Sequence, residues 1–344
     1  MRPITTMLIP SITVLAISTG CQLQEIRDLQ RREETRILEL KPGGHLSAST
    51  FNGSISVEGW DRDEVSLVAK IRERREGDVY FTAESKDGRV EIKAERDNKR
   101  NFAFVFGEQS GVSYTLRVPR KTLLSLITSN SRIEIRGIDN EVDAATSNGS
   151  ITADEIGAKA RLRTSNASVR ASSIKGGLVA WTSNGGLEIR DIQGEADLKT
   201  SNARIDVRGV NGKTYAITSN GPIIAENING DLTGKSSNSR IYIQKISGAI
   251  DLITSNGSVK AAGLNGKGRG IRLATSNASV DVTLGEAQGM LSAIAITSNS
   301  GNPSVYFENP NIQSTKDGSI TRAKIGNSDQ LIELRTSNGR ITVR

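Results

Sequence analysis

Cysteine and histidine are almost missing from this 344-residue sequence, which contains one of each, Cys21 and His45. One cysteine excludes a disulfide within the chain and a thiolate metal site. One histidine, placed before the repeats described below, excludes a Ser-His-Asp set there and a histidine metal cluster. Aromatic residues are also scarce, at 4%, beside 34 glycines. We therefore expect no metal and no cofactor, and a thin, regular core.

An excess of one charge sign is also lacking. The formal net charge of +7 is a mild excess for a chain of this length. Proteins that bind nucleic acid through their charge carry a much stronger basic excess or a basic cluster. We therefore do not expect nucleic acid to be a partner.

The first twenty residues are predicted to be an export signal. Arg2 supplies a positive start, and an apolar stretch too short to span a bilayer runs from Met7 to Ile17. The following Ser18-Thr19-Gly20-Cys21 resembles a bacterial lipobox, although leucine is commoner than Ser18. We expect lipidation of Cys21 and membrane contact through that lipid. An ordinary secretory signal with a free thiol is the alternative.

The residue after the cysteine bears on location. Gln22 stands where an aspartate would retain a lipoprotein at the inner membrane, so the sequence resembles lipoproteins sent to the outer membrane. We expect an exported, membrane-anchored protein at the outer membrane, the cell surface or the periplasmic face.

A [Thr/Ser]-Ser-Asn tripeptide recurs eleven times. Seven successive steps between its asparagines are 18 residues, and the last three are 21, 22 and 39. A fixed period of about 20 residues is typical of a solenoid, in which each coil packs only against its neighbours. The asparagines are Asn130, Asn148, Asn166, Asn184, Asn202, Asn220, Asn238, Asn256, Asn277, Asn299 and Asn338.

Each repeat contains two strand patterns when its asparagine is numbered zero. Positions +3 and +5 are apolar around a mostly polar +4, and positions +12 and +14 repeat this alternation, as in Val142 and Ala144. Such alternation indicates strands with one buried face. Between them, glycine fills +10 in six coils, from Gly176 to Gly266, and predicts a corner with positive φ. The expected fold is an all-β parallel β-solenoid (β-helix) of two-strand coils.

The recurring asparagine has a structural explanation. Equivalent residues of stacked coils lie about 4.8 Å apart. An asparagine at a corner tolerates left-handed backbone geometry, and its amide can donate to one coil while accepting from the other. We expect a structural ladder from Asn130 to Asn277. The threonine at +16 has the parity of the buried positions, which disfavours an ice-binding threonine array.

Four segments follow from these patterns. Residues 1–20 are the signal peptide, 21–38 a lipidated tether, 39–127 an N-terminal β region that caps the solenoid, and 128–344 the solenoid itself. The capping region contains a relative of the repeat, Thr50-Phe51-Asn52-Gly53.

One outward column, at +15, alternates cations with large apolar residues. Two explanations remain open: cations on every second coil avoid repulsion between stacked like charges, or the column is a stripe that binds an acidic glycan and stacks on sugars. The residue after asparagine alternates in step, which indicates a duplicated pair of coils. The basic stripe consists of Arg163, Trp181, Lys199, Ile217, Lys235 and Ile253.

The order of motifs resembles a known family. NGSISVEGWDRDEV at residues 52–65, Val118-Pro119 and the iterated SNG-x-I-x-[IV] are similar to the bacterial adhesin-like family of unknown function called DUF4097, over about residues 40–344. The resemblance implies a β-solenoid and supplies no catalytic residue.

The expected function is therefore a non-enzymatic, lipid-anchored envelope scaffold that acts as an adhesin or binding surface. A polysaccharide-active β-helix enzyme is the alternative, but it needs acidic residues clustered on one face. A structural spacer or assembly protein is the third option, with a protein partner added at the coil edge where Arg344 ends the chain. The outward carboxylates are scattered over several columns: Glu134, Asp154, Glu188, Asp206, Glu226 and Asp281.

Overall fold

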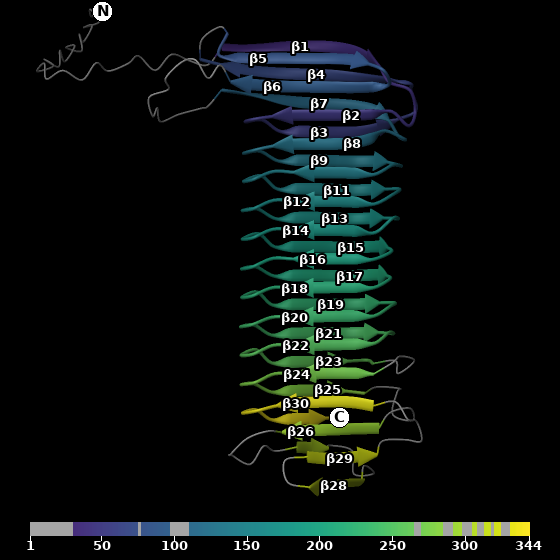
Figure 1. Ribbon diagram of the computed structural model, residues 1–344, viewed down its shortest axis with the longest axis vertical. Coiled ribbons are helices and arrows are strands. Elements are labelled where there is room, and N and C mark those ends of the chain that lie inside the picture. The colour runs from purple at the N-terminus through teal and green to yellow at the C-terminus, as the bar shows by residue number, and fades with distance from the viewer. Residues whose placement is uncertain are drawn as a thin grey trace, which may run out of the picture.

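The computed structural model describes residues 30–74, 77–96, 110–264, 270–284, 292–297, 305–307, 313–317, 320–324 and 331–344. Cys21, the predicted signal peptide, Gly266 and Asn299 lie outside these residues. The described chain consists of strands and turns stacked into a long column (Figure 1). This part of the chain has no helix with the length and apolar character needed to cross a membrane.

Two sheets run the length of the column. Sheet A contains, in spatial order, β1 (Gln30–Glu39), β4 (Glu64–Glu73), β7 (Gly111–Pro119), β3 (Ile55–Trp60), β9 (Ile133–Ile138), β11 (Ile151–Ile156), β13 (Val169–Ile174), β15 (Leu187–Gln193), β17 (Ile205–Asn211), β19 (Ile223–Ile228), β21 (Ile241–Ile246), β23 (Val259–Ala262), β25 (Val280–Thr283), β31 (Ile341–Val343) and β27 (Val305–Phe307). Sheet B contains β28 (Gln313–Asp317), β29 (Ile320–Lys324), β26 (Ser292–Thr297), β30 (Leu331–Thr336), β24 (Ile271–Ala274), β22 (Ile250–Ile253), β20 (Leu232–Lys235), β18 (Thr214–Ile217), β16 (Ala196–Lys199), β14 (Leu178–Trp181), β12 (Ala160–Arg163), β10 (Val142–Ala145), β8 (Leu123–Thr128), β2 (His45–Thr50), β6 (Arg89–Arg96) and β5 (Val79–Lys86).

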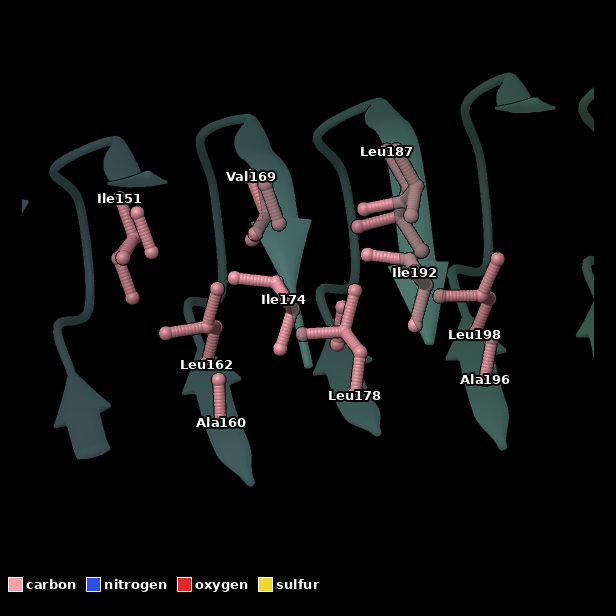
Figure 2. Packing of buried hydrophobic residues seen from close by; sticks show 14 of the residues in the cluster. Ile151, Ala160, Leu162, Val169, Ile174, Leu178, Leu187, Ile192, Ala196 and Leu198 are labelled. Atoms are coloured by element: carbon pink, nitrogen blue, oxygen red, sulfur yellow. The ribbon is translucent and has the colours of Figure 1, made fainter. Parts of the chain in front are cut away.

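The predicted parallel β-solenoid is confirmed. Each regular coil contributes one strand to each sheet, and equivalent positions pair in parallel register, as Ile151 does with Val169. The predicted apolar positions are buried between the sheets, where Ile151, Val169 and Leu187 of sheet A face residues of sheet B such as Leu162 (Figure 2). The core is one residue layer from each sheet, as the low aromatic content predicts.

Large and small core residues alternate over three successive strands of sheet B, β12, β14 and β16. Ala160 and Leu162 of one coil are followed by Leu178 and Ala180 of the next, and Ala196 and Leu198 then restore the first order. Over these strands a leucine stacks on an alanine in both inward columns, which keeps the volume between the sheets constant.

The two sheets continue into the N-terminal region. β2 and β3 form a coil whose corner is the predicted repeat relative, and Thr128 Oγ1 donates to the Gly53 carbonyl across 2.9 Å. β1 and β4 extend sheet A in antiparallel register, and β5 does the same for sheet B. β1 begins at Gln30, inside the segment predicted as a tether, because its alternating residues pair along the whole length of β4.

The C-terminal coils do not stack in chain order. β31 pairs with β25 on one side and with β27 on the other, and β30 lies between β24 and β26. The last coil in the sequence, formed by β30 and β31, therefore lies between the coil of β24 and β25 and the earlier strands β26 and β27. The expectation that the strand before Arg344 forms an open edge is therefore wrong, since both of its edges are already paired.

The corner geometry also differs from the prediction. Left-handed φ values occur at +7, where Glu155, Ser173, Asp191, Asn227 and Lys245 have φ of 54–57°. The ladder asparagines do not have positive φ.

Glycine is needed at +10 for two reasons, of which the sequence predicted one. Gly194, Gly212 and Gly230 have positive φ as predicted, at 128°, 158° and 155°, but Gly176 and Gly248 do not. A Cβ at Gly176, Gly212 or Gly248 would also collide with the backbone of the preceding coil. The short distance between stacked coils therefore selects glycine at this position.

Candidate functional site

The basic stripe lies on one outward column of sheet B. Its six residues come from consecutive strands β12 to β22 and pair one with the next in parallel register: Arg163 with Trp181, Trp181 with Lys199, Lys199 with Ile217, Ile217 with Lys235, and Lys235 with Ile253. The structure thus brings together all six predicted residues. Trp181 keeps 40% of its surface exposed.

Two of the three stripe cations have partners on the same face. Arg163 Nη2 lies 2.8 Å from Asp143 Oδ1. Lys199 Nζ lies 3.6 Å from Asp197 Oδ1 and 4.9 Å from the centroid of the Trp181 ring. These exposed contacts are weak individually, so both cations can exchange them for a ligand. Lys235 lies between Ile217 and Ile253 in the column.

The asparagines form the predicted ladder at one corner of the column. The side-chain amide of each donates to the amide oxygen of the asparagine in the preceding coil, at 2.6–2.8 Å, from Asn148 to Asn277. Asn338 adds a further step by donating to Asn277 across 2.7 Å. Within the ladder, an asparagine with neighbours on both sides donates one hydrogen bond and accepts another, as expected of a structural role.

The threonines before the asparagines point inward, as their parity predicts. They are buried, and their hydroxyl groups donate to carbonyls of the preceding coil, as Thr164 Oγ1 does to Gly149 across 2.9 Å. Their hydroxyl groups are therefore occupied inside the corner, and they form no outward threonine array.

Most of the scattered outward carboxylates of sheet A pair with arginines. Glu188 lies 2.7 Å from Arg190 and 3.4 Å from Arg170. Asp206 lies 2.9 Å from Arg208, which also lies 3.5 Å from Glu226. The hydrogen bond that Arg208 donates to Asp206, together with the negative charge of Asp206, raises the pKa of Arg208.

Asp154 lies 3.8 Å from Arg136, and Arg132 lies 3.1 Å from Glu134. Asp281 instead accepts a hydrogen bond from Ser279 across 3.2 Å. In the described ranges, no group of three His, Cys, Asp or Glu side chains could hold a metal ion.

Sheet B carries a groove that the sequence did not reveal. An open hollow of about 450 Å³ lies over β18, β20, β22, β24 and β30. We call it the Tyr215 groove, and its charged and aromatic lining consists of Lys213, Tyr215, Asp231, Asp251, Arg272 and Glu333. The only available signal was the outward column at +13, whose residues differ from coil to coil and form no motif.

Comparisons with known proteins agree with this architecture. The family model Toastrack DUF4097 matches residues 45–344. The comparison with curated proteins found no match. A crystal structure of a "putative cell adhesion protein" from Clostridium sporogenes shares 12% identity and aligns over 91% of this chain and 99% of the other, with a TM-score of 0.22, too low to support an inference about function. The family match covers most of the chain and confirms the resemblance seen in its motifs, so this chain belongs to the Toastrack DUF4097 family.

Proposed function

We propose that this protein is a non-enzymatic, lipid-anchored scaffold of the bacterial cell envelope that binds an envelope polymer on the outer face of sheet B. The alignment of the basic stripe across six consecutive strands carries this proposal. A stack of hydrogen-bonded coils holds the stripe in place before a ligand arrives, so binding costs little ordering entropy.

The stripe suits an acidic glycan. Arg163, Lys199 and Lys235 recur on every second strand, about 9–10 Å apart. The intervening Trp181, Ile217 and Ile253 offer apolar surface against which sugar rings can stack. An acidic chain laid along the column would meet cations and apolar contacts alternately.

The dispersal of the carboxylates supports a non-enzymatic role. Hydrolysis of a glycosidic bond needs two carboxyl groups on opposite sides of the bond, one of them protonated. On sheet A, Glu188 and Asp206 each form an ion pair with an arginine of the same face.

Anchoring and export rest on the sequence. The lipobox-like Ser18-Thr19-Gly20-Cys21 would place a lipid nine residues before β1, which begins at Gln30. Mass spectrometry of the purified membrane fraction tests this proposal: a diacylglycerol-modified Cys21 supports it, and an unmodified Cys21 in a released protein contradicts it.

Retention on polymers tests the binding role. The delipidated chain is passed over peptidoglycan, lipopolysaccharide and an acidic glycan in a series of salt concentrations, beside the triple variant Arg163→Glu, Lys199→Glu, Lys235→Glu. We expect saturable, salt-sensitive retention on one polymer, lost in the variant. The matched control, Arg170→Glu, Arg190→Glu, Lys260→Glu, makes the same charge change on the outer face of sheet A.

The other outcomes separate the alternatives. Equal losses in the variant and the control would reject the stripe as the binding surface. Degradation of a polymer would favour the enzyme. Failure to retain the protein on any polymer would favour a spacer or a protein partner at an end strand of the described sheets, such as β1 or β5.

A further inference from the structure

We propose that the Tyr215 groove binds a stretch of uncharged polysaccharide. The inference rests on the proposed binding function and adds a second site, with a different ligand class, beside the basic stripe. The groove and the last three stripe residues share strands, since Tyr215 and Ile217 both belong to β18, and Asp251 and Ile253 both belong to β22.

The groove results from a change in side-chain size along two outward columns. Tyr215, Thr233, Asp251, Arg272 and Glu333 are register neighbours on five adjacent strands. Thr233, together with Ala249 in the adjoining column, is short, whereas Tyr215 and Arg272 at the two sides are long. The hollow is therefore bounded by an aromatic ring on one side and a guanidinium group on the other.

The lining offers the contacts that sugars use. The half-buried ring of Tyr215 presents an apolar surface for stacking against a pyranose face. Planar carboxylate and guanidinium groups can accept from or donate to two neighbouring hydroxyl groups at once. Asp231 Oδ1 accepts a hydrogen bond from the Ala249 backbone N–H across 3.0 Å, which fixes the orientation of this carboxylate.

Asp251 has unused hydrogen-bonding capacity. Its Oδ1 is buried and has no hydrogen-bond partner. The nearest cation, Arg272 Nη1, lies 3.7 Å away, beyond hydrogen-bonding distance. The Asp251 side chain is 40% exposed, so its carboxylate is accessible to a ligand hydroxyl, which could supply the hydrogen bond that Oδ1 lacks.

The charge of the groove selects an uncharged ligand. Three carboxylates, Asp231, Asp251 and Glu333, stand against two cations, Lys213 and Arg272. A uronate, sulfate or phosphate group would approach a site with more negative than positive charge, and this repulsion disfavours it. The ligand class therefore differs from that of the basic stripe.

The length of the groove favours a polymer over a free sugar. Five adjacent strands extend over about 19 Å across the sheet, which is longer than one pyranose ring. A polymer in the groove runs across the strands, along the column axis. Because the hollow is open to solvent, such a chain would leave it by passing over Tyr215 at one end and Arg272 at the other.

Affinity electrophoresis of the full chain in native gels containing dextran, mannan, a mixed-linkage glucan or, for comparison, alginate tests the proposal. We expect retardation by one of the uncharged polymers, insensitive to salt. Tyr215→Ala and Asp251→Asn should each weaken this retardation at least about fivefold, the effect of losing one aromatic or hydrogen-bonding contact. Tyr242→Ala and Asp281→Asn, on the outer face of sheet A, are the matched controls and should leave it unchanged.

Each result decides between the two sites. If an uncharged polymer retards the Tyr215→Ala and Asp251→Asn variants as strongly as the wild type, the Tyr215 groove is not the binding site. The scaffold function is unaffected by that result. Binding to alginate alone, lost in the stripe variant, supports the scaffold function and overturns the groove. Absence of retardation by all three uncharged polymers overturns the groove, whereas the scaffold function is decided by the separate retention experiment on peptidoglycan, lipopolysaccharide and an acidic glycan. Circular dichroism and thermal unfolding of each variant confirm that losses do not reflect misfolding.

Discussion

The side-chain amide of Asn148 donates a 2.7 Å hydrogen bond to the amide oxygen of Asn130 in the preceding coil. The same contact joins asparagines that are 18 positions apart in the chain, such as Asn184 and Asn202. It also joins Asn277 and Asn338, which are 61 positions apart. The ladder thus follows the stacking of coils in space and not their order in sequence. It holds the inserted C-terminal coil in the same register as all the others.

Breaking one rung of this ladder should destabilise the solenoid. Asn202 donates to Asn184 and accepts from Asn220, so Asn202→Ala removes two exposed hydrogen bonds. We expect a loss of about 1–2 kcal/mol in the free energy of unfolding, measured by urea denaturation. Asn202→Asp should cost at least as much, because a carboxylate cannot donate to Asn184 and repels its oxygen. A variant as stable as the wild type would contradict the structural role of the ladder.

At the position after a ladder asparagine, alanine should be replaceable by glycine, but glycine should not be replaceable by alanine. A Cβ on Gly221 would collide with the carbonyl oxygen of Ala203 in the preceding coil. We expect Gly221→Ala to cost about 1–3 kcal/mol, since the coils cannot separate without breaking strand pairing. The reverse change in the neighbouring coil, Ala203→Gly, should cost no more than about 1 kcal/mol. The free energies of unfolding are measured by denaturant unfolding. Equal losses for Gly221→Ala and Ala203→Gly would refute this explanation of why glycine and alanine alternate after the ladder asparagines.

The solenoid was predictable because its signals are local and repeated. The apolar residues at +3, +5, +12 and +14 determine which face of each strand is buried. Because each coil packs only against its neighbours, the structure expected for one coil applies to all the regular coils. The order of the last coils was not predictable, because the regular period is lost between Asn299 and Asn338 and one coil edge can pair with any other. The left-handed position at +7 was signalled only in part, since glycine occupies it in three coils, at Gly137, Gly209 and Gly263, whereas residues as different as Glu155 and Lys245 occupy it in others.

The two candidate sites also differ in how far the sequence predicts them. The basic stripe was found because parity and period place its residues on one outward column, a relation that needs no tertiary information. The Tyr215 groove depends on differences in side-chain size between neighbouring coils. Thr233 and Ala249 are unremarkable in sequence, and the hollow appears only when they are set between Tyr215 and Arg272.

The left-handed corner residues should be stabilised by glycine. Lys245 is exposed and has φ of 55°, a conformation that costs a residue with a Cβ about 1–2 kcal/mol. After the greater unfolded-state entropy of glycine is subtracted, Lys245→Gly should raise the free energy of unfolding by about 0.5–1 kcal/mol. Lys260→Gly, at an exposed position inside β23 without positive φ, is the matched control and should lower it by a similar amount. Destabilisation by both changes would contradict strain at this corner.

Tyr114 should make the protein sensitive to alkaline pH. Its side chain is 1% exposed, and its hydroxyl group donates to the Ser49 carbonyl across 2.9 Å. Burial raises the pKa of Tyr114, although a hydrogen bond with Thr50 acts in the opposite direction. The folded state therefore holds the phenolic proton more tightly than the unfolded state, in which the pKa is about 10. This contribution is fully present below about pH 10 and decreases as the pH rises from there towards the higher pKa of the folded state.

Comparison with Tyr114→Phe isolates this effect. The variant lacks the hydrogen bond to Ser49 and should be about 1 kcal/mol less stable than the wild type at pH 8. Phenylalanine cannot ionise, so the stability advantage of the wild type should fall by roughly 1.4 kcal/mol for each pH unit above the unfolded pKa and should reverse in sign before the end of the range measured. Urea denaturation at pH 8 to 11.5 measures this change. Tyr80→Phe, at a side chain 58% exposed on β5, should keep the pH profile of the wild type. A constant difference between Tyr114→Phe and the wild type over this range would show that Tyr114 ionises as readily in the folded state as in the unfolded chain.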